Sequence, residues 1–264
     1  NYVIILLALA IGSVIGLLVA KRVEMTSIPE MVSLFNGFGG ACAVAISFVE
    51  MGKFTNESPI GVVATTYAAL FIGAVAFTGS VIAYGKLAGK VKDWRSGISS
   101  YFNLVWLALC VGSIVVEILN IGQFGFLPYT ILTISLIYGV TFVLPIGGAD
   151  MPVVISLLNA ITGVAAALAG VVYGNMVMLL GGILVGSSGT ILTVLMCQAM
   201  NRSLFNVLVG GFGGSTAASS TEGIDGTVKE ATLNDTAIMM RYAKNVVIIP
   251  GYGMAVAQAQ HALR

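Results

Sequence analysis

The chain has 264 residues, of which 58% are hydrophobic and only 9% carry a charge, and its formal net charge is +1. Soluble domains carry about 25% charged residues, so this composition excludes an ordinary water-soluble globule. The near-neutral balance and the lack of a basic patch give no reason to expect a nucleic-acid partner. A mean hydropathy of +1.00 indicates a protein that lies mostly in the lipid bilayer.

Seven apolar segments are each long enough to cross a bilayer as a helix, which takes about 20 residues. They are residues 2–20, 29–50, 60–85, 101–119, 126–144, 151–172 and 175–200. The first segment has neither a preceding basic stretch nor a clear cleavage site, so we expect a mature span and not a signal peptide. We therefore predict an all-α membrane protein, with a bundle of about seven helices in residues 1–203.

The basic residues of the connecting loops are distributed unevenly. One side of the predicted bundle carries Lys21, Arg22, Lys86, Lys90, Lys92, Arg95 and Arg202, and the other side carries only Lys53. By the positive-inside rule the first side is cytoplasmic. We expect the N-terminus of this chain outside and its C-terminus in the cytoplasm.

Small residues recur at helical spacing in the last two segments. Gly182 and Gly186 form a G-x-x-x-G motif that Gly189 follows, and Ala165–Gly170 is rich in alanine. Such residues let two membrane helices approach closely. The three cysteines, Cys42, Cys110 and Cys197, fall within apolar segments without paired spacing. We expect them to be buried apolar side chains, with no disulfide and no metal site.

Polar side chains in three segments fall at similar depth. Asp150 precedes Pro152 and is a candidate helix cap, and Asn159 lies ~13 Å further along that helix. Asn36 lies ~10 Å beyond the Pro29 that marks the start of its own helix. The last segment brings polar residues to a comparable level: Ser187, Ser188, Thr190 and Thr193. These groups either form hydrogen bonds between helices or line a hydrated path.

The chain offers no good proton carrier at that level. Its only histidine, His261, lies outside the apolar segments, and asparagine does not titrate near neutral pH. Glu50 and Glu117 fall near the outer ends of two segments, either as proton entry groups or as carboxylates that reach the interface. If the path conducts protons, another polypeptide must supply the titrating group, and a histidine is the best candidate.

After residue 203 the composition changes. Residues 204–232 include a Gly/Ser/Thr-rich linker, and residues 233–264 begin a second domain. There we expect a short helix with Asn234 or Asp235 as its N-cap and a strand at Val246–Ile249. The strand leads into a glycine turn, Gly251-Tyr252-Gly253-Met254-Ala255-Val256, that could approach a pyrophosphate but has valine where the full fingerprint has glycine. This pattern predicts the start of an α/β, Rossmann-like domain.

Several stretches together resemble the membrane part of the β subunit of proton-translocating NAD(P) transhydrogenase. They are "KRVEMTSIPEMV", "AFTGSVIAYGKL", "IGGADMPVVISLLN", "VGSSGTIL", "MCQAMNRSL" and "PGYGMAVAQAQ", in the family's order. In that family, proton passage through the bundle is coupled to hydride transfer between NAD(H) and NADP(H) outside the membrane. The resemblance implies two further helices upstream, a complete NADP(H)-binding domain downstream, and a location in the inner membrane of a bacterium. It also implies partner α subunits with more helices and the NAD(H)-binding domain, in a two-fold dimeric assembly.

The resemblance also assigns roles to residues. It implies that Asp150 faces the NADP(H) domain at the membrane boundary and that Arg202 begins the connection to that domain. It places Asn159 in the proton path and makes Gly251–Val256 part of the NADP(H) site. The last helix of the path contributes small polar positions, which are Ser187, Ser188 and Thr193.

Two positions depart from the family pattern. Asn36 stands where many members have the proton-carrying histidine, and Gln198 stands where some have lysine. The first departure suggests that a histidine of the partner α subunit replaces the missing one, with Asn36 and Asn159 sharing its water. Two other functions stay open from the residues alone. One is a secondary transporter or ion channel with an Asn/Ser-lined site, and the other is a structural anchor for a nucleotide-binding enzyme.

Overall fold

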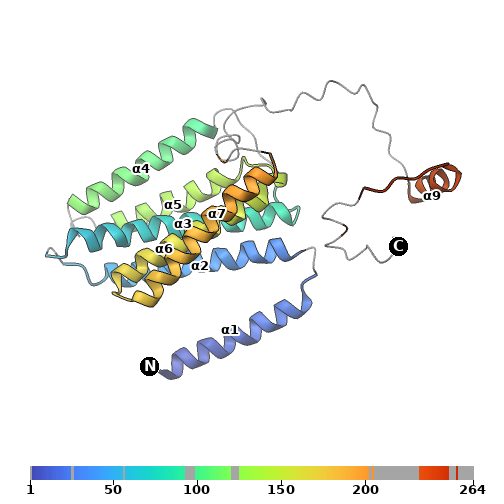
Figure 1. The fold of residues 1–264 in the computed structure, drawn as a ribbon. Helices are drawn as coiled ribbons and strands as arrows, with labels where there is room; N and C mark the ends of the chain where they lie inside the picture. Colours follow the sequence, from blue (N-terminus) through green and yellow to red (C-terminus); the bar gives the residue numbers. More distant parts are fainter. Residues whose placement is uncertain are drawn as a thin grey trace. The chain divides into compact units, whose positions relative to one another are not determined.

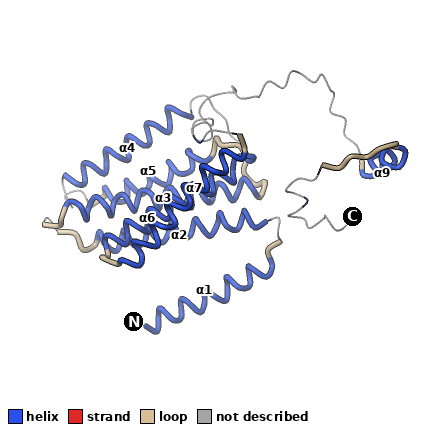
Figure 2. Tube along the Cα trace, in the orientation of Figure 1, coloured by secondary structure: helices blue, strands red, loops and turns tan. Residues whose placement is uncertain are grey.

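A computed structural model of the chain describes residues 2–24, 27–55, 57–92, 99–119, 125–201, 204, 232–249 and 254. All secondary structure among these residues is helical (Figure 2). The chain divides into two units. The first comprises residues 1–23 and 27–214, and the second comprises residues 24–26 and 215–264.

The helices of the first unit follow the predicted apolar segments (Figure 1). They are α1 (Tyr2–Arg22), α2 (Ile28–Met51), α3 (Ile60–Leu87), α4 (Ser99–Leu119), α5 (Leu127–Val143), α6 (Met151–Val172) and α7 (Met176–Ala199). By length and composition, α1, α2, α3, α6 and α7 can each cross a membrane. Helix α5 and the segment Asn103–Leu119 of α4 are apolar but shorter. The prediction of an all-helical membrane protein is confirmed at this level.

Local chemistry fixes where the helices begin. Proline occupies the first turn of α2, α5 and α6, where its missing N–H breaks no helical hydrogen bond. Asn175 caps α7, because its side-chain oxygen accepts hydrogen bonds from the amides of Val177 and Met178, each 3.1 Å away. Gly174 precedes this cap with a φ of +60°, a conformation that favours glycine.

Asp150 differs from its predicted role as a helix cap. It stands at the N-cap position of α6, but its side chain forms no capping hydrogen bond. A short 3-10 helix, η2 (Gly148–Asp150), leads into α6 and gives Asp150 a helical backbone with φ −92° and ψ −2°. A capping side chain reaches the first free amides from an extended backbone, so the 3-10 entry prevents the cap.

Helix α3 lies at the centre of the first unit. It packs against α2, α5 and α6, and α6 packs in turn against α7. Two apolar clusters hold these helices together. The first joins Ala83 of α3 to Ile146 and to the first turns of α6, and the second joins Tyr67 and Leu70 of α3 to α4 and α5. Burial of these side chains in lipid gains mainly packing, since the lipid tails are themselves apolar.

The buried face of α2 contains small residues and one glutamate. Its members are Ser33, Gly37, Gly40, Ala43, Ser47 and Glu50. This composition brings the two backbones together. A Cβ atom on Gly40 would lie 2.6 Å from the carbonyl oxygen of Gly73, and one on Gly73 would lie 2.8 Å from that of Gly40. Real Cβ contacts of this length essentially never occur, so the α2–α3 contact requires both glycines.

Helices α6 and α7 approach each other in the same way. A Cβ atom on Gly163 would lie 2.5 Å from the amide nitrogen of Gly186, and one on Gly182 would collide with the backbone of Ala167. Gly189 would meet Ala160 at 2.9 Å. The predicted close approach at Gly182, Gly186 and Gly189 is therefore confirmed.

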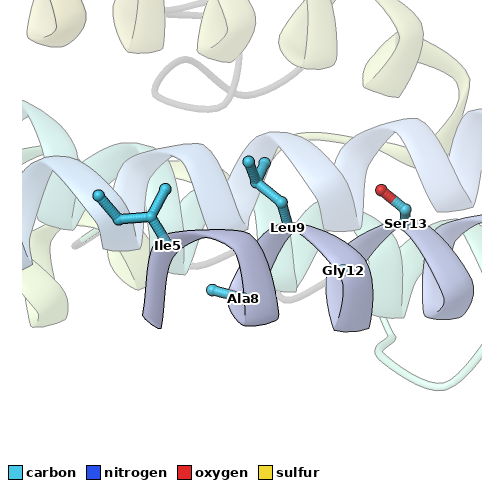
Figure 3. A pocket seen from close by; sticks show the side chains of 5 residues that line it. All are labelled: Ile5, Ala8, Leu9, Gly12 and Ser13. Carbon is cyan, nitrogen blue, oxygen red and sulfur yellow. The ribbon is translucent and has the colours of Figure 1, made fainter. Parts of the chain in front are cut away.

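Helix α1 differs from the others because none of its described residues is buried. One of its faces lines a wide, shallow groove of about 570 Å³. Figure 3 shows the five residues that form it, which are Ile5, Ala8, Leu9, Gly12 and Ser13. Their spacing is that of one helical face. Helix α1 therefore contributes nothing to the two apolar clusters.

The second unit contains one described helix, α9 (Leu233–Tyr242). Its N-cap is Thr232, not Asn234 or Asp235 as predicted. Thr232 and Asp235 form a capping box, in which each side chain bonds to the other residue's backbone amide. The box requires Asp235 three residues after the cap, which explains the shift of the helix start.

The predicted strand at Val246–Ile249 is not formed, and all four side chains are exposed. A strand needs a neighbour to pair its backbone groups, and no described segment provides one. Of the glycine turn, only Met254 is described, in a helical conformation. Gly251, Tyr252, Gly253, Ala255 and Val256 lie outside the described residues, as does nearly all of the 204–232 linker.

Candidate functional site

Asn36 is joined to α3 by a hydrogen bond to a residue that the sequence analysis did not single out. Its side-chain amide donates to the hydroxyl of Ser80, 2.9 Å away. Ser33, one turn earlier on α2, donates to the backbone oxygen of Ser80 at 2.8 Å. Ser33 and Ser80 are fully buried, and Asn36 is half-buried. Ser80 lies within the quoted stretch "AFTGSVIAYGKL", but its neighbours alone do not show which helix face it occupies.

A second polar pair joins α6 to α7. The fully buried Thr193 donates to the carbonyl oxygen of Gly189 at 2.7 Å and faces the hydroxyl of Ser156 at 3.0 Å. Ser156 in turn lies 3.3 Å from that same oxygen of Gly189. The prediction that Thr193 lies among polar groups is thus supported, but Ser156 was missed. Glycine at 189 permits this arrangement, because it lets α6 approach the carbonyl closely.

The other predicted path residues face outward. Asn159, Ser187 and Ser188 are all exposed. Ser187 and Ser188 donate to carbonyl oxygens of their own helix, at 3.2 and 3.3 Å. Asn159 forms no side-chain hydrogen bond with the described part of the chain. The structure therefore brings the buried Thr193 together with Ser156, and it leaves these three polar side chains on the surface of the unit.

The two asparagines nevertheless lie at one level of the bundle. Helices α2 and α6 run in the same direction, because each runs antiparallel to α3. A Cβ atom on Gly39 of α2 would lie 3.1 Å from a methyl carbon of Thr162 on α6. Asn36 and Asn159 each precede those residues by three positions, which is ~4.5 Å along either helix. The predicted similarity in depth therefore agrees with the register of the helices.

The α7 register brings its serines to the same height. Gly189 is in contact with Ala160, the residue next to Asn159, and α7 runs antiparallel to α6. Ser187 and Ser188 precede Gly189 and so lie within about one helical turn of Asn159 along the axis. Polar groups from three apolar helices therefore share one level, some of them buried and others open to the surface.

At one end of α3 the structure buries a charge that the sequence analysis assigned to a loop. Lys86 is only 7% exposed, and its Nζ donates to the carbonyl oxygens of Leu144 and Ile146, each 2.6 Å away. These carbonyls belong to the turn that precedes Asp150, which is itself buried. Ile146 and Met151 lie in one apolar cluster with Ala83 and Cys197. Asp150 is thus held at the mouth of α6 by packed neighbours on both sides.

Two carboxylates at the opposite end of the bundle, Glu50 and Glu117, are also buried. Glu117 is 3% exposed, and Tyr67 donates to its Oε1 at 3.1 Å. Glu50 forms an ion pair of 2.6 Å with Lys53, whose ammonium lies 5.6 Å from the centre of the Tyr173 ring. The hydrogen bond to Glu50 raises the pKa of Lys53, and burial raises the pKa of Tyr173.

The described residues contain no group of three His, Cys, Asp or Glu side chains that could hold a metal ion. Cys110 and Cys197 are buried as expected, but Cys42 is exposed. It lies on the side of α2 that faces away from α3, so its burial was predicted wrongly. An exposed cysteine on a membrane helix still meets an apolar environment, which suits a weakly polar side chain.

Comparison with known proteins shows the family of this chain. The family model described as NAD(P) transhydrogenase beta subunit matches residues 1–264. The chain belongs to this family. Two curated relatives, both NAD(P) transhydrogenase subunits beta from Rhodospirillum rubrum, are each 42% identical to it over 275 aligned positions. The alignment covers the whole chain and 59% of each relative, so the chain spans less than two thirds of their length. The family and the long apolar helices together identify an integral membrane protein.

Proposed function

We propose that this transhydrogenase β chain is the proton-conducting membrane part of an NAD(P) transhydrogenase. In this function, passage of protons through the bundle drives or is driven by hydride transfer between NAD(H) and NADP(H). The observation that carries the proposal is the family match over residues 1–264. The shared level of polar groups on α2, α6 and α7, in helices that are otherwise apolar, supports it.

The proposed path is formed by Asn36, Asn159, Ser187, Ser188 and Thr193. Ser80 is the hydrogen-bond partner of Asn36, and Ser156 is that of Thr193. Amides and hydroxyls both donate and accept hydrogen bonds, so they can order water without carrying a charge. Exposed polar groups at membrane depth must meet water or another polypeptide, because lipid tails offer no partner. The outward position of Asn159, Ser187 and Ser188 therefore favours a surface that neighbouring helices cover.

We assign those neighbouring helices to the partner α subunits, which also carry the NAD(H)-binding domain, in a two-fold dimeric assembly. Because Asn36 replaces the family's histidine, a histidine on a partner helix supplies the titrating group. Asn36 and Asn159, at one level on adjacent parallel helices, would share the water next to it. This chain's own His261 plays no part in the path, since it lies outside the membrane helices.

Coupling to the nucleotide is assigned to Asp150 and Arg202. The burial of Asp150 at the mouth of α6 favours this role, because a carboxyl in such a place responds to charges that approach from the adjoining domain. Arg202 lies outside the described residues, and its assignment rests on the family alone. When bound, NADP(H) supplies or accepts the hydride, and Asp150 holds or releases a proton at its carboxylate oxygens.

The NADP(H) domain is proposed to begin at residue 233, after a linker at 204–232, and to use the glycine turn Gly251–Val256. The described residues do not form a cradle for a pyrophosphate, since the segment before the turn is not a strand. No contact to the nucleotide is therefore assigned to an individual atom. In the same proposal α4 and α5 cross the membrane with the five longer helices, and the N-terminus lies outside.

Proton flux in vesicles tests the function. Vesicles that contain this chain and its partner subunits should show flux that requires NADP(H) and follows hydride transfer. Pumping should survive replacement of His261 and fail when the partner histidine is removed. Flux of a solute without nucleotides would instead support a transporter or channel. Hydride transfer that neither generates a proton gradient nor responds to one would mean that the bundle only anchors the enzyme in the membrane.

A further inference from the structure

Lys86 is a buried lysine whose ammonium group donates two hydrogen bonds to a single turn. Its Nζ donates to Leu144 O and Ile146 O, both at 2.6 Å, and the residue is 7% exposed. Burying a charge is costly unless hydrogen bonds replace its hydration. A methionine would fill the same space without that cost, so packing alone does not explain a lysine here.

The two carbonyl groups explain the need for a cation. Leu144 is the C-cap of α5, and the last carbonyls of a helix have no partner within it. They also form the negative end of the helix dipole, which a cation stabilises. Ile146 follows Pro145, so the two bonds from Lys86 fix the turn on both sides of the proline. One side chain of α3 therefore sets the direction in which the chain leaves α5.

The turn leads directly to Asp150. The side chain of Ile146 is buried with Met151 and Val154 of α6, and the amide of Asp150 donates to the carbonyl oxygen of Gly147 at 3.0 Å. On α3, Lys86 follows Ser80 by six residues, which is ~9 Å along the helix. A single rigid helix thus carries both the partner of Asn36 and the group that holds the turn before Asp150.

We propose that Lys86 is a positioning residue for the coupling step, because it clamps the 144–147 turn and thereby fixes Asp150 relative to the Asn36–Ser80 pair. This role rests on the proposed function. Lys86 does not move a proton itself. It keeps the carboxyl group of Asp150 at a fixed position relative to the Asn36–Ser80 pair. A structural change at Asp150 is then transmitted to that pair, and the reverse.

The test compares substitutions at the end of α3 in the full assembly with its partner subunits. Lys86→Met keeps the length of the side chain and removes the charge and donors. Lys86→Arg keeps the charge and the N–H donors. Lys90→Met is the matched control, since Lys90 is exposed one turn later and its ammonium lies over the Tyr84 ring at 5.4 Å. Two quantities are measured: protons moved per hydride in vesicles, and amide hydrogen exchange of residues 144–150.

For Lys86→Met we expect the proton-to-hydride ratio to fall about 3- to 30-fold, the range that residues along a coupled network produce. Exchange of the 144–150 amides should accelerate, while the α2–α3 contact stays protected. Lys86→Arg should restore both quantities, and Lys90→Met should resemble the wild type. A purely structural lysine would lower the amount of assembled protein but leave the ratio unchanged, and that result would overturn the proposal.

Two further outcomes are also decisive. If Lys86→Met does not assemble, Lys86→Gln replaces it, because glutamine keeps N–H donors without the charge. Wild-type ratio and exchange in Lys86→Gln would contradict the need for a cation. If the wild-type assembly itself moves no protons with hydride transfer, the proposed function fails. The exchange of residues 144–150 then still decides whether Lys86 holds the turn.

Discussion

The side-chain amide of Asn36 donates a hydrogen bond of 2.9 Å to the hydroxyl of Ser80, across the contact between α2 and α3. Ser80 also fixes Ser33 through its backbone oxygen. The side-chain amide of Asn36 is thereby oriented by a residue of this same chain. Asn36 itself is half-buried, so part of its side chain stays accessible beside this hydrogen bond.

Replacing Ser80 with alanine should release that amide. We expect a loss of about 1 kcal/mol in stability, the usual size of a hydrogen bond between membrane helices. We also expect slower proton translocation, because the water next to Asn36 loses a fixed neighbour. Thermal unfolding in detergent and flux in vesicles measure the two effects. Ser113→Ala is the control, since Ser113 is half-buried on α4 and its hydroxyl donates to a carbonyl oxygen of its own helix, that of Leu109. Equal effects of both substitutions would contradict the prediction.

The Ser156–Thr193 pair permits a double-mutant cycle. We expect Ser156→Ala and Thr193→Val to show a coupling energy of about 0.6 kcal/mol, the average for such pairs in a membrane protein. Thr190→Val should not couple to Ser156→Ala, because Thr190 is exposed and bonds to Gly186 of its own helix. Denaturation of the purified protein in mixed micelles gives the four free energies. Additive values for Ser156 and Thr193 would mean that the 3.0 Å contact contributes nothing.

Two adjacent glycines on α7 differ sharply in what surrounds them. Gly182 faces the backbone of α6, whereas a Cβ on Gly181 would have nothing within 4 Å. Gly182→Ala should destabilise the protein by about 1–3 kcal/mol, as overpacking does, because backbone atoms cannot move aside like a side chain. Gly181→Ala should be neutral or slightly stabilising, since alanine favours the helix. Thermal unfolding of the two variants side by side checks the difference, and similar melting temperatures would refute it.

Asp150→Asn keeps the shape of the side chain and removes its ability to ionise. We expect hydride transfer to persist while NADP(H) binding no longer responds to proton uptake, because the buried carboxyl at the mouth of α6 is the proposed relay. The affinity for NADP(H) is measured across a pH series in the assembled enzyme. The same pH dependence in the variant and the wild type would remove Asp150 from the relay.

In the second unit, the hydrogen bonds from Thr232 lower the pKa of Asp235 below its ordinary value of 3.8. A carboxyl with a lowered pKa in the folded state stabilises the helix above its unfolded pKa, and this contribution is lost as the pH falls through the folded value. Helix α9 should therefore lose order in acid below pH 3.8. Backbone NMR shifts of residues 233–242 in the full chain measure this. Asp235→Asn should abolish the acid transition, and an unchanged transition would assign it to another group.

Local patterns in the sequence were sufficient for part of this fold. The glycine spacing on α7 predicted its close approach to α6, because a G-x-x-x-G face is a property of one helix. The rise per residue predicted that Asn36 and Asn159 lie at similar depth. Both inferences need only the geometry of a single helix, and the register of α2 and α6 agrees with them.

Other features depend on which face each helix directs toward its neighbours. The sequence of an evenly apolar helix does not show this face. Ser80 and Ser156 were missed for that reason, and Ser187 and Ser188 face outward. Lys86 was counted as a loop charge, because its carbonyl partners lie about 60 residues away in the chain. The strand at Val246–Ile249 was predicted from composition, but pairing requires a neighbouring strand.

The contact between Gly40 and Gly73 has a consequence for the speed of events at Asn36. The two backbones pack closely there, with no room for a side chain between them, and close-packed contacts resist deformation. Reorientation of Asn36 is therefore expected as a rotation of its side chain on a stationary backbone. Such a rotation needs no collective motion of helices or domains, which takes microseconds to milliseconds. Under the proposed function, we therefore expect the slow step of turnover in the nucleotide domains or in their docking at Asp150.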